Sequence, residues 1–196
     1  QRTESYFQNS NLSAQGQSAS PAEMKILRGA KLPREILQNG YVASAGDEKG
    51  HNRQVRQTAL DLLKKSGYAI VDGRLVHKRS GDALEFEILV QTREDERLAL
   101  TYSRMLNSIG VMAKVRYVDA TQYQNRLQSF DFDMIIYNWY ASLSPGNEQA
   151  FYWGSAAADQ KGSRNYPGIK SKQVDRAIEA LTQARKREDF VTAARA

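Results

Sequence analysis

A chain of 196 residues, of which 41% are hydrophobic, is long enough to bury one core or to form one lobe of a larger protein, and this composition excludes a largely disordered chain. The absence of cysteine excludes disulfides, thiolate metal sites and cysteine nucleophiles. The net charge is +6, but Lys and Arg are interspersed with Asp and Glu, as in KREDF and TREDER, which favours a solvated surface over a nucleic-acid interface.

The two ends of the sequence lack the usual signals of a complete precursor. The chain opens with QRTESYFQNS, without an initiating Met or the charged start and apolar stretch of a signal peptide. It stops within the amphipathic pattern KREDFVTAARA, so we expect a mature form or an excised piece. No apolar run approaches the ~18 residues that a membrane span requires, and no membrane insertion is expected.

Residues 1–50 show little periodicity and are expected to form an extended N-terminal arm that packs on other protein. A short helix is predicted after Ser20, because this capping residue is followed by Pro21 and, at the third helical position, by Glu23. Residues 40–52 are then predicted to form a loop.

Regular patterning begins in residues 51–196, which are predicted to form an α/β ligand-binding lobe truncated at its C-terminal helix. A helix over 53–67 ends at a glycine, and a hairpin over 69–78 turns at Asp72 and Gly73. The residues on the predicted apolar face of this helix are Val55, Ala59, Leu62 and Leu63.

From residue 84 onward, strands and helices are predicted to alternate. The predicted strands are 84–91, 113–119 and 133–139, and the helices between them are 95–110 and 121–130. The apolar positions expected to face inward from the first helix are Leu98, Tyr102, Met105, Leu106 and Ile109. Thr121 is expected to cap the second helix. A last helix is predicted over 171–186, with Val174, Ile178 and Leu181 on its apolar face.

The β-α-β-α-β order implies an α/β lobe, in which ligands bind past the carboxyl ends of strands. The segment IIYNWYASLSPGNEQAFYWGS, residues 135–155, lies at such a place. Loop aromatics supply rigid contact area at low entropic cost, and small polar residues leave backbone amides accessible. The segment therefore predicts a site for an extended ligand. The alternative is that its rings complete the core, with Phe151 and Trp153 as the expected core residues.

Several stretches carry a resemblance to one known family. They are DFDMIIYNW, NYPGIKSKQVDRAIEAL, and the helix, glycine turn and strand of RLALTYSRMLNSIGVMAKVRYVD. These resemble the C-terminal lobe of a family 5 extracellular solute-binding protein, of the peptide-binding type that serves ABC importers. SYFQNSNLSAQG and SLSPGNEQ followed by YWGSAA are most similar to the YejA-like branch of oligopeptide binders.

The resemblance implies the fold of one lobe of a two-lobed periplasmic binding protein (type II, family 5), with a mixed sheet and flanking helices. It implies a longer, periplasmic and monomeric protein that closes over a peptide or modified peptide and delivers it to an inner-membrane ABC permease. It implies no catalytic residue and no cofactor. The residues expected to bind ligand are Tyr137, Asn138, Trp139, Tyr140, Ser142, Leu143, Ser144, Asn147, Glu148, Arg164 and Asn165.

Ser142 departs from the family pattern. Dipeptide and oligopeptide binders of the family carry an Asp three residues after the strand tryptophan, and that Asp pairs with the peptide's α-ammonium. Serine cannot supply the opposite charge, and a buried ammonium without one is costly. Glu148 could substitute at a different spacing. We therefore expect that a free peptide N-terminus is not recognised at Ser142. Arg164 is expected to bind a ligand carboxylate, or else to be a surface arginine.

Three alternatives remain open. A sugar, an opine or a metal chelate would keep the family but change the ligand. An enzyme could use Asp131 and Asp133, which face one side of a strand, but the sequence has no G-x-S-x-G elbow, P-loop or H-E-x-x-H motif. A nucleic-acid-binding α/β domain could stack bases on the rings, although these fall in a loop rather than on a sheet face. His51 and His77 lack ligand spacing, so no metal site is expected.

Overall fold

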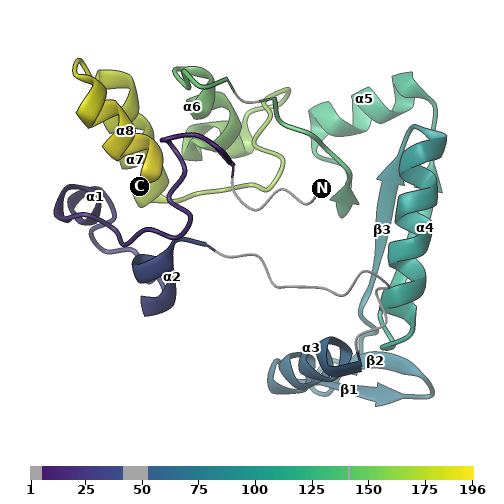
Figure 1. Cartoon of the computed structure of the whole chain (residues 1–196). Helices are drawn as coiled ribbons and strands as arrows, with labels where there is room; N and C mark the ends of the chain where they lie inside the picture. Colours follow the sequence, from purple (N-terminus) through teal and green to yellow (C-terminus); the bar gives the residue numbers. More distant parts are fainter. Residues whose placement is uncertain (1–5, 42–52, 141) are drawn as a thin grey trace. The chain divides into compact units, whose positions relative to one another are not determined.

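The computed structural model describes residues 6–41, 53–140 and 142–196, which belong to two compact units (Figure 1). Unit 1 comprises Gln1–Ser44 and Trp139–Ala196, and unit 2 comprises Ala45–Asn138. That residues 1–50 form an extended arm in the whole protein stays a prediction. In this chain, the described part of Gln1–Ser44 packs with Trp139–Ala196.

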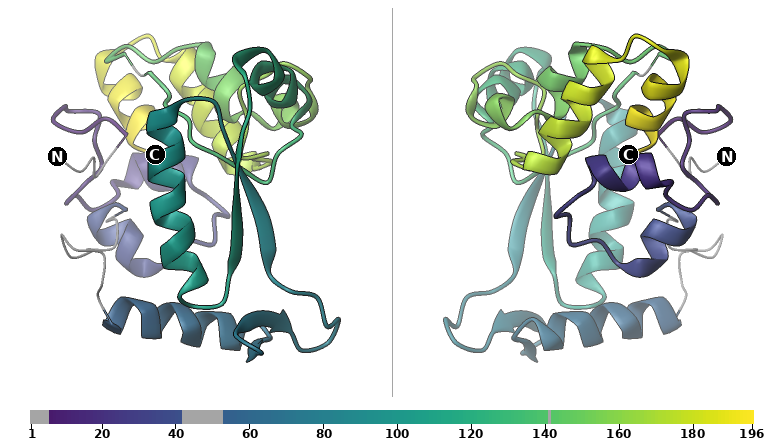
Figure 2. Two further views of the ribbon diagram at one scale, coloured as in Figure 1. Left: turned by 90° about the vertical axis from the view of Figure 1, so that its right-hand side faces the viewer. Right: turned by 90° about the vertical axis from the view of Figure 1, so that its left-hand side faces the viewer.

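Unit 2 is built on a parallel sheet and a separate hairpin. Its elements are α3 (Arg53–Lys65), β1 (Tyr68–Val71), β2 (Arg74–His77), β3 (Glu85–Val90), α4 (Arg93–Asn107), β4 (Met112–Tyr117), α5 (Ala120–Ser129) and β5 (Met134–Ile135). The parallel sheet has the order β4-β3-β5, and β1 pairs with β2 in antiparallel fashion. Helix α4 lies along β3 and β4 (Figure 2). The predicted β-α-β-α-β order is confirmed.

Local sequence signals account for most boundaries in unit 2. Asp72 and Gly73 have φ angles of 48° and 78°, which form the predicted two-residue hairpin turn. The helix α4 begins after Thr92, whose side chain accepts a hydrogen bond from the backbone N–H of Asp95. The predicted cap of α5 was wrong: Asp119, not Thr121, accepts from the N–H of Gln122.

The face that α4 presents to the sheet differs from the prediction. Leu98, Tyr102 and Met105 were expected to be buried, but they are 58%, 44% and 42% exposed. Ala99 and Ser103 are buried instead, and the Ser103 hydroxyl donates to the carbonyl of Ala113 on β4. Small side chains let the helix approach the strand closely enough for this bond, and the larger residues are turned outward. The remaining predicted residues, Leu106 and Ile109, do contribute to the core.

The buried core of unit 2 includes two clusters formed by described residues. The first contains Ile88, Val90, Ala99 and Ala113, and the second contains Leu75, Ile109 and Val111. Ala59 and Leu63 of α3 pack against the second cluster as predicted, whereas Val55 and Leu62 of the predicted apolar face are 48% and 58% exposed. The hairpin and α3 are therefore joined to the turn between α4 and β4 by apolar packing.

Unit 1 is mainly helical. Its elements are α1 (Pro21–Ile26), α2 (Arg34–Asn39), α6 (Glu148–Trp153), the 3-10 helix η1 (Ser155–Asp159), α7 (Lys172–Gln183) and α8 (Arg187–Arg195). The predicted capping box is present, because Glu23 N–H donates to Ser20 Oγ and Ser20 N–H donates to Glu23 Oε2. Helix α1 packs on α7 and α8 (Figure 2, right). Leu181 of α7 is buried, and Val174 and Ile178 are half-buried.

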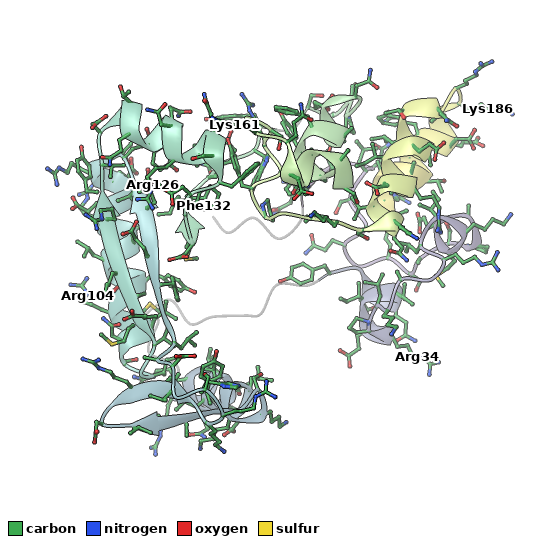
Figure 3. The ribbon with its side chains drawn as sticks, turned by 180° about the vertical axis from the view of Figure 1, so that it is seen from behind. Arg34, Arg104, Arg126, Phe132, Lys161 and Lys186 are labelled. Atoms are coloured by element: carbon green, nitrogen blue, oxygen red, sulfur yellow. The ribbon has the colours of Figure 1, made fainter. Side chains whose placement is uncertain are left out.

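Basic side chains occur on separate elements of the chain. Arg34 lies on α2, Arg104 on α4, Lys161 after η1, and Lys186 immediately before α8 (Figure 3). This distribution along the chain agrees with the expected solvated surface.

Gly110→Ala is expected to destabilise the protein more than Gly81→Ala. Both glycines have positive φ, 86° and 79°, where an L side chain costs about 1–2 kcal/mol. A Cβ at Gly110 would also lie 3.0 Å from the backbone N of Leu75, whereas one at Gly81 would meet nothing within 4 Å. Urea unfolding should show a loss of about 1 kcal/mol for Gly81→Ala and about 2–3 kcal/mol for Gly110→Ala. Equal losses would contradict the steric argument.

Candidate functional site

An aromatic cluster in unit 1 anchors the candidate loop, which we define as residues 139–147, with residue 141 outside the described residues. The cluster comprises Tyr6, Phe7, Trp139, Trp153 and Tyr166. The ring centroid of Trp139 lies 4.8 Å from that of Trp153 and 6.2 Å from that of Tyr166, and Tyr6 meets Trp153 at 6.0 Å. Such pairs contribute about 0.5–1.5 kcal/mol each beyond their buried area. Trp139 therefore fixes the start of the loop in unit 1.

The next residues of the loop point outward. Tyr140 is 89% exposed and Leu143 is 61% exposed, and Ser142 and Ser144 are exposed too. The backbone N–H of Ser144 donates to Ser142 Oγ at 3.1 Å, so the two serines form one local turn. The loop thus offers an aromatic ring, an apolar side chain and hydroxyls. Residues 139–147 include no charged side chain.

Glu148 is the first charged residue after the loop and begins α6. Its Oε1 accepts from the backbone N–H of Gly146 at 2.8 Å and from Gln149 Nε2 at 3.2 Å. Burial raises the pKa of Glu148, but these hydrogen bonds outweigh burial and hold the pKa below its usual range. The carboxylate consequently stabilises the loop at neutral pH, and this stabilisation is lost as the pH falls through the lowered pKa.

Asn147 and Arg164 both lie on the surface of unit 1. The side chain of Asn147 makes no capping hydrogen bond to α6. The backbone N–H of Arg164 donates to the carbonyl of Phe151, and its guanidinium carbon lies 6.0 Å from the ring centroid of Tyr152. This distance is at the outer limit of a cation–π contact, so the guanidinium is accessible to a carboxylate. Phe151 is 38% exposed, and the expectation that it is a core residue was wrong.

Asn165 is fully buried beneath these residues. Its Nδ2 donates to the carbonyls of Gly154 and Ile169, both at 2.9 Å, and its Oδ1 accepts from the backbone N–H of Ile169 at 2.9 Å. The amide therefore joins the end of α6 to the loop before α7. This predicted ligand-binding residue lies inside the fold, where it positions backbone rather than facing outward.

Further hydrogen bonds join the residues after α6 to the start of α7. The N–H of Ser155 donates to Asp175 Oδ1 at 2.8 Å, and Ser155 Oγ accepts from the N–H of Ser171 at 2.9 Å. At Gly154, a Cβ would lie 2.5 Å from the carbonyl oxygen of Ala150, so only glycine fits. The start of α7 and the end of α6 are thereby fixed to each other.

Tyr137 and Asn138 belong to unit 2 and follow β5 after one intervening residue, Ile136. Tyr137 is half-buried and Asn138 is exposed. The hydroxyl of Tyr123 on α5 donates to the carbonyl of Ile136 at 3.3 Å, and burial raises the pKa of Tyr123 to about 12. The phenol therefore stays protonated and holds the segment just before these two residues.

Of the two carboxylates considered for catalysis, Asp131 takes part in an ion-pair network in unit 2, and Asp133 accepts a backbone hydrogen bond. Arg126 donates to Glu87 Oε1 at 2.8 Å and to Asp131 Oδ2 at 3.0 Å, and Arg116 binds Glu87 Oε2 at 3.0 Å. Asp133 Oδ2 accepts from the backbone N–H of Glu87 at 2.9 Å. Asp133 thus joins the segment before β5 to β3 directly, and Asp131 does so through Arg126, which is labelled in Figure 3.

The described residues contain neither a cluster of metal-binding side chains nor a membrane-spanning helix. No group of three or more His, Cys, Asp or Glu side chains among them could hold a metal ion. Within the same residues, no helix has the length and apolar character needed to cross a membrane.

Sequence reasoning missed three members of the aromatic cluster. Tyr6 and Phe7 lie in the segment SYFQNSNLSAQG, and Tyr166 follows Asn165 in NYPG. Both stretches carry the family resemblance, but no local periodicity indicates that their rings meet Trp139 and Trp153. That meeting depends on contacts between distant parts of the chain.

The family model for "Bacterial extracellular solute-binding proteins, family 5 Middle" matches residues 25–162. The peptidoglycan-binding protein YepA of Agrobacterium fabrum is 46% identical over 197 residues, which cover 100% of this chain and 32% of that protein. The probable peptide-binding protein YejA of the same organism is 39% identical over 198 residues, with the same two coverages. The chain therefore spans about a third of the length of these curated relatives.

Solved structures show the same fold at lower identity. The oligopeptide-binding protein AppA of Bacillus subtilis, in complex with a nonapeptide, gives a TM-score of 0.61 at 18% identity and covers 94% of this chain and 38% of AppA. A mannohexaose-bound periplasmic oligopeptide-binding protein of Thermotoga maritima gives 0.62 at 16%, with coverages of 94% and 37%. NikZ of Campylobacter jejuni with Ni(L-His) gives 0.59 at 22%, with coverages of 89% and 39%. These likenesses confirm the predicted fold class.

Asn165→Ala is expected to lower the free energy of unfolding by about 2–4 kcal/mol, because one buried and two partly buried backbone groups lose their partner. Asn147→Ala is the matched control, since this exposed asparagine caps nothing, and should change stability by less than about 0.5 kcal/mol. Urea unfolding of both variants measures the difference. A loss below about 1 kcal/mol for Asn165→Ala would mean that water replaces the amide.

Proposed function

This chain belongs to the family 5 bacterial extracellular solute-binding proteins, and we propose that the whole protein is the periplasmic, monomeric solute-binding component of an ABC importer. It captures a peptide or modified peptide between two closing lobes and delivers it to the inner-membrane permease. The chain spans 32% of the length of its relative YepA, so the opposing lobe and the contact with the permease are proposed for the whole protein.

The exposed side of the candidate loop is the observation that carries this proposal. Tyr140, Ser142, Leu143 and Ser144 are exposed, while Trp139 behind them is packed in the aromatic cluster. A rigid support with an outward aromatic ring, hydroxyls and backbone amides suits an extended ligand that is bound chiefly through its main chain. We assign ligand contact to these residues and to Tyr137, Asn138, Asn147, Glu148 and Arg164, and give Asn165 a positioning role.

Sequence similarity favours peptides over other solutes. The relatives at 46% and 39% identity are named peptidoglycan-binding and probable peptide-binding proteins, whereas the structures with mannohexaose and Ni(L-His) are only 16% and 22% identical. We therefore place peptide-containing fragments of peptidoglycan first among candidate ligands. A sugar or a metal chelate is the second candidate, because proteins with this fold hold such ligands.

The proposal assigns no catalysis to the protein. Asp131 is bound by Arg126, and Asp133 accepts the backbone N–H of Glu87, so both carboxylates have structural partners. Ligand capture needs only differential affinity for the closed state, which a neutral loop and aromatic surface can supply.

The first test is to purify the full-length protein natively from the periplasm, denature it and identify the released small molecules by mass spectrometry. We expect a peptide or a peptide joined to a sugar. Release of a sugar, an opine or a metal chelate would keep the family assignment but overturn the peptide ligand. If nothing is released, titration of the protein with a panel of peptides and peptidoglycan fragments decides the question, and binding of none of them would refute it.

Ser142→Asp in the full-length protein should create a preference for a free peptide N-terminus. The wild type has no acidic side chain in the loop, and the Glu148 carboxylate is already bound by Gly146 and Gln149, so a free peptide and its N-acetylated form should differ little in Kd. A carboxylate at position 142 should favour the free form by about tenfold, equivalent to ~1.4 kcal/mol. Ser144→Asp is the control for added charge alone. A large wild-type preference for the free form that disappears in Ser142→Ala would contradict this interpretation.

A further inference from the structure

Unit 1 contains an apolar groove, which we call the α7–α8 groove, with a volume of about 610 Å³. Its walls come from helices α6, α7 and α8, from the chain after α1, and from the N-terminal segment. The large apolar side chains that line it include Phe7, Leu12, Leu27, Trp153, Ile178 and Leu181. Filled with water alone, this volume would hold about 20 molecules against apolar walls, which is unfavourable.

The polar groups around the groove are poorly suited to orienting a small ligand. Gln149 Nε2 donates to Glu148, Ser171 Oγ donates to Gln173 Oε1, and Arg195 Nε donates to the carbonyl of Asn11. Ligand pockets of this size usually combine apolar walls with a few convergent polar groups that fix the ligand. These three polar groups are bonded within unit 1, and most of the remaining lining is apolar, which favours an apolar occupant held by packing.

Small residues give the groove room for another segment of polypeptide. Ala30, Ala177, Ala193 and Ala194 all contribute to its lining. Alanine side chains allow a neighbouring backbone to approach closely, as they do where helices pack. A helix or an extended segment with apolar side chains therefore fits this groove better than a compact solute.

The source of that segment follows from the lengths of this chain and of its relatives. The aligned stretch makes up 32% of YepA and of YejA from Agrobacterium fabrum, so about two thirds of each relative lies outside it. We propose that the α7–α8 groove is an internal interface of the longer protein, filled by an apolar segment of the same polypeptide from outside residues 1–196. The interface is independent of which ligand the candidate loop binds.

Two exposed apolar residues of unit 1 provide a matched test. Leu32 lines the groove and is 37% exposed, whereas Met24 on α1 is outside the groove lining and is 42% exposed. Residues 1–196 contain no cysteine, so Leu32→Cys and Met24→Cys can be made in the full-length protein after any other cysteines are replaced by serine. The rate of maleimide labelling of the native protein reports whether each position is covered.

We expect native Leu32→Cys to be labelled at least about tenfold more slowly than native Met24→Cys, with equal rates in urea. The protection should persist on dilution and after unfolding and refolding in clean buffer, because an intramolecular segment cannot leave. Equal native rates would overturn the proposal by showing an open groove. Protection lost on dilution would identify a second copy, and protection lost after refolding in clean buffer would identify a small molecule. Either of these results would also overturn it.

Discussion

The buried amide of Asn165 is the interaction on which the architecture of the candidate site depends. One side chain satisfies the carbonyls of Gly154 and Ile169 and the N–H of Ile169, with no exposed surface of its own. Buried backbone groups that lack a partner cost about 1–3 kcal/mol each. The segment from Gly154 to Ile169 therefore has few other arrangements of comparable energy. The end of α6 is thereby fixed, and with it Trp153, on whose ring Trp139 packs.

Rigidity and exposure are divided along the candidate loop. Trp139 is held by ring contacts, whereas Tyr140, Ser142 and Leu143 stand outside the cluster. A site that captures and releases a solute benefits from this division, since preorganised contacts lose less conformational entropy on binding. The loop itself is neutral, and the charged residue that follows it, Glu148, uses its carboxylate to bind the loop backbone.

Each unit has an apolar surface that the described residues leave exposed. In unit 2, Leu98, Tyr102 and Met105 form a row on α4 that no described residue buries. In unit 1, the α7–α8 groove is apolar. Rows and grooves of this kind mark surfaces for other protein, whereas scattered exposed apolar residues need no explanation. A chain that spans about a third of its relatives' length is expected to have such surfaces.

The sequence by itself determined the local elements and the family. The Ser20 cap, the Asp72–Gly73 turn and the β-α-β-α-β order act over a few residues, and the family motifs are contiguous. Only the tertiary structure decided which face of α4 is buried, because close approach to β4 favours the small side chains of Ala99 and Ser103 over the larger apolar ones beside them. It also decided that Asn165 supports the site from within: its partners come from a separate turn, and helical or strand periodicity does not encode contacts of that kind.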